Sequence, residues 1–129
     1  MSVACLSLRY VHLSNLRVAL NLGFAPNLET LMLGGHNGTV QLYMPVVMLK
    51  LRSLELYGLR LTMLDLGLTP NLEKLELHRC IDLVDVCGAT GCLNLKHIKF
   101  QMTNQRTFDL RLASNLETLE LIWSKVEDP

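Results

Sequence analysis

The chain repeats itself every 44 residues. The pattern Asn-Leu-Glu-x-Leu-x-Leu begins at Asn27 and returns at Asn71 and at Asn115, with no insertion or deletion between the copies. Chance would hardly preserve this spacing through two further copies, even in a chain rich in leucine. Because self-similarity at a fixed period is typical of stacked repeats, the sequence predicts a repeat protein and not an ordinary globular domain.

Each 44-residue period contains a second copy of the same spacing, Leu-x-x-Leu-x-Leu, in which Ile and Phe also serve as apolar residues. This copy starts at Leu51 and Leu95, and an imperfect one, a residue out of the 44-residue register, starts at Leu8. The motifs therefore start near residues 8, 28, 51, 72, 95 and 116, at intervals of 20, 23, 21, 23 and 21. These intervals predict one leucine-rich-repeat domain over residues 1–129 with about six repeats.

The motif spacing predicts where each side chain points. In a strand, alternate side chains share a face, so the fourth and sixth motif positions face inward while the third, fifth and seventh face outward. One repeat cannot bury its own leucines, but repeats stacked about 4.8 Å apart cover one another. We therefore expect an α/β leucine-rich-repeat solenoid, with a curved parallel sheet on the concave face and with loops and short helical turns on the convex face.

Composition argues against several functional classes. Twelve basic and twelve acidic residues cancel and no Lys/Arg cluster stands out, so no nucleic-acid partner is expected. Apolar stretches fall far short of the ~20 residues that span a bilayer, so no membrane partner is expected. Arg9, His12 and Arg17 interrupt any N-terminal signal-peptide core. We expect an intracellular, cytoplasmic protein, with the nucleus as an alternative location.

No pattern of reactive residues predicts catalysis, a metal or a cofactor. Cys80 falls where the repeat needs a small inward residue, and Cys87 and Cys92 lack the second pair or histidine motif of a zinc site. The chain has no phosphate-binding loop. His78 and His97 fall at opposite ends of their expected strands, roughly 13 Å apart at ~3.3 Å per residue. We expect a protein that is not an enzyme.

The outward positions suggest two different surfaces. At the second motif position the charges alternate in sign, and we interpret them as a ladder that helps to set register and not as a ligand site. Its members are Arg9, Glu29, Arg52, Glu73, Lys96 and Glu117. The third, fifth and seventh positions give a mixed polar and aromatic face suited to binding a protein. The candidate residues are Tyr10, His12, Met32, Ser53, Glu55, Tyr57, Lys74, Glu76, His78, His97, Lys99 and Glu120.

Residues 6–122 resemble the leucine-rich-repeat region of plant intracellular immune receptors. The resemblance is to the nucleotide-binding class with a Toll/interleukin-receptor-type N-terminal domain. It rests on LDLGLTPNLEKLEL at residues 64–77 and on LxxLxLxxCxxLxxV from Leu72 to Val86. It implies a recognition or autoinhibitory module whose partner is a pathogen effector, a guarded host protein or a flanking receptor domain. The chain lacks the nucleotide-binding switch and the signalling domain of such receptors, so ATP binding and signalling are not carried over.

The chain departs from that pattern at one position. The position that usually carries Asn or Cys reads Leu16, His36, Leu59, Cys80, Thr103 and Ser124, and only Cys80 fits. We therefore expect no ordered ladder of such side chains bonding the return loops.

Several alternatives remain open from the sequence. Because neither end shows a capping segment, and uncovered leucines lose about 1.5–3 kcal/mol each, we expect flanking repeats, a partner or self-association to cover the ends. This predicts a fragment or truncated relative of a longer receptor. The alternatives are a free-standing adaptor outside immunity, a secreted receptor glycosylated at Asn37 within Asn37-Gly38-Thr39, or a degenerate gene product.

Overall fold

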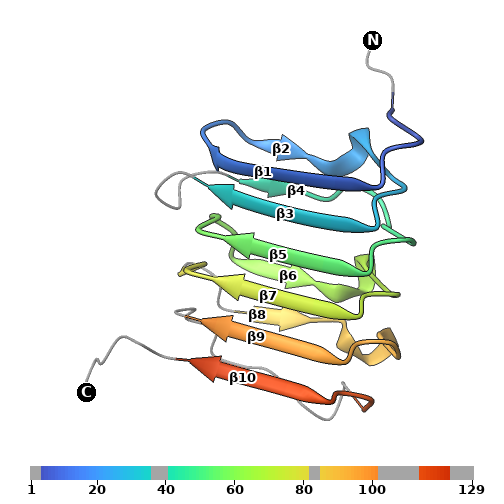
Figure 1. Cartoon of the computed structure of the whole chain (residues 1–129), viewed down its shortest axis with the longest axis vertical. Coiled ribbons are helices and arrows are strands. Elements are labelled where there is room, and N and C mark those ends of the chain that lie inside the picture. Colours follow the sequence, from blue (N-terminus) through green and yellow to red (C-terminus); the bar gives the residue numbers. More distant parts are fainter. Residues whose placement is uncertain (1–3, 36–40, 82–84, 102–113, 123–129) are drawn as a thin grey trace.

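The computed structural model shows a solenoid built on one parallel β-sheet (Figure 1). It describes residues 4–35, 41–81, 85–101 and 114–122. Six strands, all running in the same direction, form the main sheet in the order β1-β3-β5-β7-β9-β10. Their bounds are β1 Tyr10–Leu16, β3 Thr30–Gly35, β5 Ser53–Tyr57, β7 Lys74–His78, β9 His97–Gln101 and β10 Thr118–Ile122.

The register of the main sheet joins equivalent positions of successive motifs. Tyr10 pairs with Thr30, Thr30 with Ser53, Ser53 with Lys74, Lys74 with His97, and His97 with Thr118. The pairing therefore follows the intervals of the sequence motifs at every step, including the imperfect copy at Leu8. This confirms the predicted parallel stacking, while the extent of the repeat domain over residues 1–129 stays a prediction.

The return segments form a second layer behind the main sheet (Figure 1). It contains β2 Leu20–Asn21, β4 Leu42–Tyr43, β6 Met63–Asp65 and β8 Asp85–Cys87, which pair in parallel as β2-β4 and β6-β8. Short 3-10 turns follow the first, third and fourth of these strands: η1 Leu22–Phe24, η2 Leu66–Leu68 and η3 Ala89–Gly91. The described residues hold no α-helix, so the expected α/β class and helical convex face are present only as these short turns.

The core lies between the two layers and consists mainly of leucine. The inward residues of β3, β5 and β7 are fully buried, and those of β9 nearly so: Leu31, Leu33, Leu54, Leu56, Leu75, Leu77, Ile98 and Phe100. Cys80 is also fully buried, which confirms its predicted inward position. Its thiol points at the carbonyl oxygen of Leu56, 3.9 Å away, and burial raises its pKa. Cys80 therefore behaves as a small core residue.

A tight turn precedes each of the first five motifs, and it accounts for the buried position of Cys92. The amide of the first motif leucine donates to the carbonyl oxygen of the residue three places earlier, as in Leu72 to Thr69 and Leu95 to Cys92. The corresponding residues Ala25, Met48, Thr69 and Cys92 are buried, whereas Cys5 of the first turn is exposed. Cys92 donates its thiol to the carbonyl oxygen of Leu66 at 3.3 Å, and burial and then the charge of Asp65 raise its pKa. It is a core turn residue.

Two kinds of hydrogen bond join successive repeats. The carbonyl oxygen at each second motif position accepts from the second and third amides of the next repeat; that of Arg52, for example, accepts from Glu73 and Lys74. In alternate repeats an asparagine before the strand also donates its amide to the previous return segment. These bonds run from Asn27 to Leu6, Asn71 to Leu49 and Asn115 to Leu93, at 2.8, 2.6 and 2.7 Å.

The asparagine bonds correct the sequence analysis. An ordered set of side chains does bond the return loops, and its members are the asparagines that precede the strands. At the position that usually carries Asn or Cys, three of the six residues lie outside the described part of the chain, and Cys80 contacts the carbonyl oxygens of Leu56 and His78. The repeated position of Asn27, Asn71 and Asn115 in the sequence does not reveal these bonds, because their acceptors lie in the preceding repeat.

Gly88 is the glycine that the turn layer most strictly requires. Its φ of +79° lies in the left-handed region, and a Cβ there would lie 2.5 Å from both Asp65 Oδ1 and the Gly67 nitrogen. Those two atoms already form the hydrogen bond that caps η2, at 2.8 Å. The absence of a side chain at Gly88 therefore lets two return turns stack.

We predict that Gly88→Ala lowers the free energy of unfolding by about 1–3 kcal/mol, because it adds both backbone strain and a clash with the η2 cap. Chemical denaturation followed by circular dichroism measures this. Gly91→Ala is the matched control, because a Cβ at Gly91 meets nothing within 4 Å. Equal losses of unfolding free energy in the two variants would contradict the close packing of η2 against η3.

Candidate functional site

All twelve candidate residues lie on the outward face of the main sheet, on the side away from the return layer. We call the side chains at the third, fifth and seventh motif positions of this sheet the outward face. Tyr10 and His12 come from β1, Met32 from β3, Ser53, Glu55 and Tyr57 from β5, Lys74, Glu76 and His78 from β7, His97 and Lys99 from β9, and Glu120 from β10.

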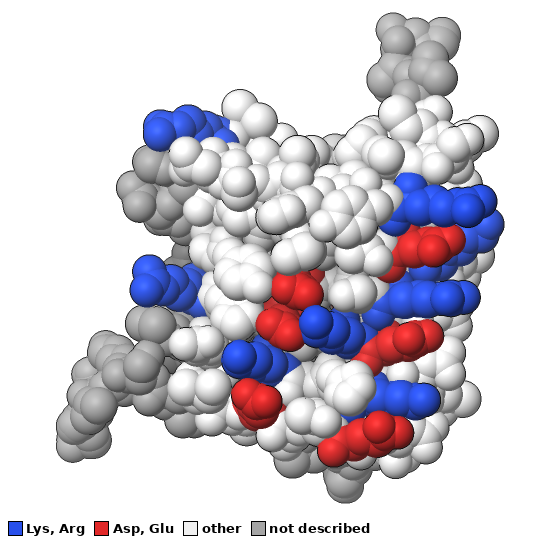
Figure 2. Space-filling view, viewed as in Figure 1, with Lys and Arg blue, Asp and Glu red and all other residues white. Residues whose placement is uncertain are grey.

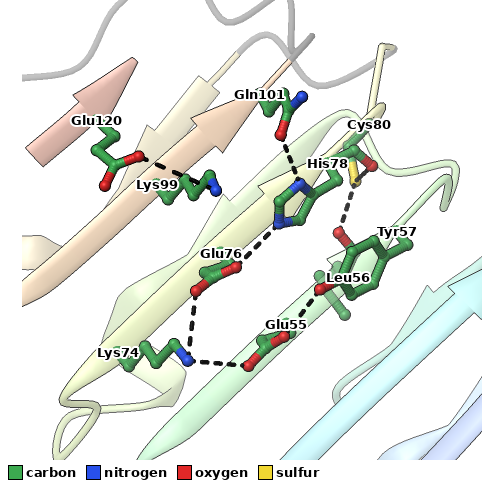
Figure 3. Close-up of polar contacts among 10 residues, drawn as sticks. All are labelled: Glu55, Leu56, Tyr57, Lys74, Glu76, His78, Cys80, Lys99, Gln101 and Glu120. Atoms are coloured by element: carbon green, nitrogen blue, oxygen red, sulfur yellow. Dashed lines mark hydrogen bonds and ion pairs between the residues drawn. The ribbon is translucent and has the colours of Figure 1, made fainter. Parts of the chain in front are cut away.

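The structure brings five of these residues into one connected cluster, which spans β5 and β7 (Figure 3). Lys74 Nζ lies 3.1 Å from Glu55 Oε2 and 3.3 Å from Glu76 Oε2. The two glutamates are direct register partners, and like charges in that position repel. Lys74 offsets this repulsion by lying between them. Tyr57 donates its hydroxyl to Glu55 Oε1 at 2.9 Å, which ties the aromatic ring to the same network.

An aromatic stack completes this cluster. Tyr57 and His78 are register partners on β5 and β7, and their rings lie 4.4 Å apart with planes only 5° from parallel. The His78 ring is held from both sides, with Nε2 3.0 Å from Glu76 Oε1 and Nδ1 3.2 Å from Gln101 Oε1 (Figure 3). We call Glu55, Tyr57, Lys74, Glu76 and His78 the Tyr-His cluster. Every one of its side chains contacts at least one other through an ion pair, a hydrogen bond or the ring stack.

The cluster shifts the acid–base properties of three of its members. Burial, followed by the hydrogen bond to Glu55 and the charges of Glu55 and Glu76, raises the pKa of Tyr57 to about 12. The hydrogen bond to Glu55 raises the pKa of Lys74 against the opposing effect of burial. Burial acts to raise the pKa of Glu76, but the hydrogen bonds from His78 and Lys74 outweigh it and the pKa is lowered. Lys74 and Glu76 are therefore held ionised and Tyr57 neutral.

The remaining candidates lie around this cluster. Lys99 Nζ lies 4.0 Å from Glu120 Oε1, and Tyr10 Oη lies 3.9 Å from the sulfur of Met32. A shallow depression of about 360 Å³ runs between the Tyr-His cluster and β10. Its lining comprises Lys74, Glu76, His97, Ile98, Lys99, Thr118 and Glu120. Ser53 is half-buried at the start of β5, and His12 is exposed on β1.

The charge ladder of the second motif position follows the side of the sheet where the strands begin. Basic and acidic side chains alternate down that side (Figure 2). Arg9 Nε lies 3.7 Å from Glu29 Oε2, and both side chains are well exposed. A polar depression of about 450 Å³ lies beside the ladder, lined in part by Glu29, Arg52 and Glu73. The main-chain carbonyl groups of Arg9, Glu29, Arg52, Glu73 and Lys96 accept the bonds that join successive repeats, and the role of the side-chain charges in setting register stays a prediction.

The geometry contains no arrangement for metal binding within the described ranges, where no three His, Cys, Asp or Glu side chains gather closely enough to hold an ion. His78 and His97 lie at opposite ends of neighbouring strands, as predicted, because His78 pairs with Gln101 and His97 with Lys74. No helix in the described part of the chain is long and apolar enough to cross a bilayer. Asn37 lies outside the described residues.

Sequence reasoning missed the pairing within the cluster and the part played by Gln101. Tyr57 and His78 share the seventh motif position in consecutive repeats, so their contact follows from the register alone. That signal was present in the sequence. The bond from His78 to Gln101 extends the same column into a third repeat.

Comparison with known proteins adds no relative to this picture. No protein-family model matches the chain, and no curated protein and no solved structure is significantly similar to it.

We predict that the Tyr57 phenol titrates near pH 12. A Tyr10→Phe/Tyr43→Phe variant leaves Tyr57 as the only one of the three tyrosines, so phenolate absorbance reports its pKa directly. Adding Glu55→Gln is expected to move the midpoint toward 10, because it removes a charge and weakens the hydrogen bond. The raised pKa stabilises the fold below about pH 10, and this stabilisation is lost as the pH rises through 12. An unshifted midpoint near 10 in the folded protein would contradict the network.

We also predict that ionised Glu76 stabilises the fold in a pH-dependent way. Its pKa is lowered, so the stabilisation is present above its ordinary value of 4.5 and is lost as the pH falls through the folded-state pKa. Glu76→Gln should lower the free energy of unfolding by up to about 1 kcal/mol near neutral pH, and the difference should vanish in acid. Urea denaturation across pH measures this. Glu120→Gln, on the exposed β10, is the control and should show a smaller difference.

Proposed function

We propose that this chain is a leucine-rich-repeat module that binds another protein through its outward face. The motif intervals match those of leucine-rich repeats, and the parallel register that follows these intervals supports this interpretation. The resemblance of residues 64–77 to plant intracellular immune receptors supports a role in pathogen recognition and defence. On this proposal the chain is part of such a receptor, or a relative of its repeat region, and acts inside the cell.

The Tyr-His cluster is the observation that carries the proposal. Aromatic side chains are enriched at the centres of protein interfaces. Association also costs less side-chain conformational entropy when the contact residues are already ordered. Tyr57 and His78 satisfy both conditions, since they stack on each other and are each bonded to a glutamate. A free solvated face does not require such a network.

The charges around the stack indicate the chemistry of the partner. Glu55, Glu76 and Glu120 outnumber Lys74 and Lys99 on this face, and the exposed Tyr57 ring offers a flat apolar surface. An arginine fits both features, because its guanidinium group stacks on aromatic rings and pairs with carboxylates. We propose a partner protein that presents an arginine to Tyr57, whether it is a pathogen effector, a guarded host protein or a flanking receptor domain.

We predict that the Tyr57→Ala/His78→Ala variant no longer binds a partner protein that the wild-type chain binds specifically. The immobilised chain and its variants are incubated with extracts of healthy and pathogen-challenged plant leaves, and bound proteins are quantified by mass spectrometry. A partner retained by the wild-type chain should be lost by this variant, and also by Glu55→Ala/Glu76→Ala/Lys99→Ala. Each purified partner is then titrated against the same proteins, and the affinity should fall at least about tenfold.

The matched control is Tyr43→Ala/Met63→Ala. Both side chains are exposed in the return layer, so the control removes similar apolar area from the other layer of the solenoid. It should bind every specific partner as the wild type does. Partners that are lost by the control but kept by the Tyr57/His78 variant would show that the return layer is the binding surface.

A further inference from the structure

The two outer strands of the main sheet each have a neighbour on one side only. In the described part of the chain, β1 and β10 stand at opposite ends of the strand order (Figure 1). Most of their inward side chains are correspondingly less covered, although Val11 on β1 is only 8% exposed. Leu13 on β1 is 36% exposed, and Leu119 and Leu121 on β10 are 36% and 40% exposed, whereas the equivalent Leu75 and Leu77 are fully buried. Each end of the solenoid thus presents apolar side chains beside an open strand edge.

The charges at these two ends are opposite. Along the ladder the sign alternates at every step from Arg9 to Glu117, so the basic member stands at the β1 end and the acidic member at the β10 end. At the fifth motif position β10 carries a second acidic residue, Glu120, and β1 carries His12. If β1 of a second copy followed β10, Glu117 would meet Arg9 and Glu120 would meet His12. The alternation would then continue without a break.

The backbone pattern also continues across such a contact. Within the chain, the carbonyl oxygen of Lys96 accepts from the amides of Glu117 and Thr118. The carbonyl oxygen of Glu117 is in the same position to accept from Arg9 and Tyr10 of a second copy. The inward residues then match as Leu119 with Val11 and Leu121 with Leu13.

We infer that β10 of one copy pairs in parallel with β1 of a second copy, so that the chain associates head to tail with itself. Opposite charges favour this contact over a symmetric one, because two β10 edges would bring the acidic Glu117 and Glu120 of both copies together. A head-to-tail contact uses two different surfaces, so each added copy leaves a new edge open and the assembly grows beyond a dimer. The outward face stays accessible along such an assembly.

Charge reversal at the two ends tests the inference. Sedimentation velocity of the full chain is measured over a wide range of concentration, together with Arg9→Glu and Glu117→Arg. The wild type should grow past the dimer as its concentration rises, and each variant should associate about tenfold more weakly, since each creates a like-charged contact. Mixing the two variants should restore growth. Both ladder ends of the Arg9→Glu chain are acidic and both ladder ends of the Glu117→Arg chain are basic, so each contact between the two kinds of chain joins opposite charges. Arg9→Glu/Glu117→Arg in one chain should restore it as well.

Arg52→Glu and Glu73→Arg are the matched controls. They make the same changes of charge at the same motif position on inner strands, so they should leave self-association unchanged. Circular dichroism verifies that each variant stays folded. A wild-type chain that remains monomeric, one that stops growing at a dimer, or association that neither end variant weakens would overturn the inference. These outcomes concern the sheet edges alone, so the partner-binding experiment on the outward face is read independently of them.

Discussion

The burial of each repeat's leucines by its neighbours is the interaction on which the rest of the structure depends. A single motif has two inward side chains in its strand and cannot remove them from water by itself. Stacking removes them fully in the inner strands, as the zero exposure of Leu54, Leu56, Leu75 and Leu77 shows. Because side chains alternate across a strand, a slip of one residue would exchange this core for the polar outward face. The register is therefore strongly determined.

A determined register makes neighbours of residues that share a motif position. The same rule places Tyr57 on His78, Glu55 beside Glu76, and alternating charges along the start of the strands. These contacts have different consequences. The exposed charge ladder contributes little stability per pair, whereas the partly buried cluster on β5 and β7 shifts pKa values and holds two aromatic rings in place. The main sheet thus carries a rigid patch on an otherwise polar face.

Much of the candidate site could be predicted from the sequence, and the part that could not depends on contacts between repeats. The outward positions of Glu55, Tyr57, Lys74, Glu76 and His78 follow from alternation within a strand. Their connection into one network required the distances across the sheet, since Lys74 pairs with acidic residues on its own strand and on β5. The asparagine bonds show the same limit, because Asn71 reaches a carbonyl group 22 residues away.

The sequence by itself determined the repeat, the strand positions, the inward and outward faces, and the register. All of these follow from the period of the motif and from alternation of side chains along a strand. The tertiary structure alone decided the form of the return layer, where short strands and 3-10 turns replace the expected helical face and Gly88 makes room for the Asp65 cap. It also decided the ion pairs through which Lys74 joins Glu55 and Glu76 into one network. The physical reason is that turns and side-chain networks depend on packing between residues of different repeats, which no local pattern records.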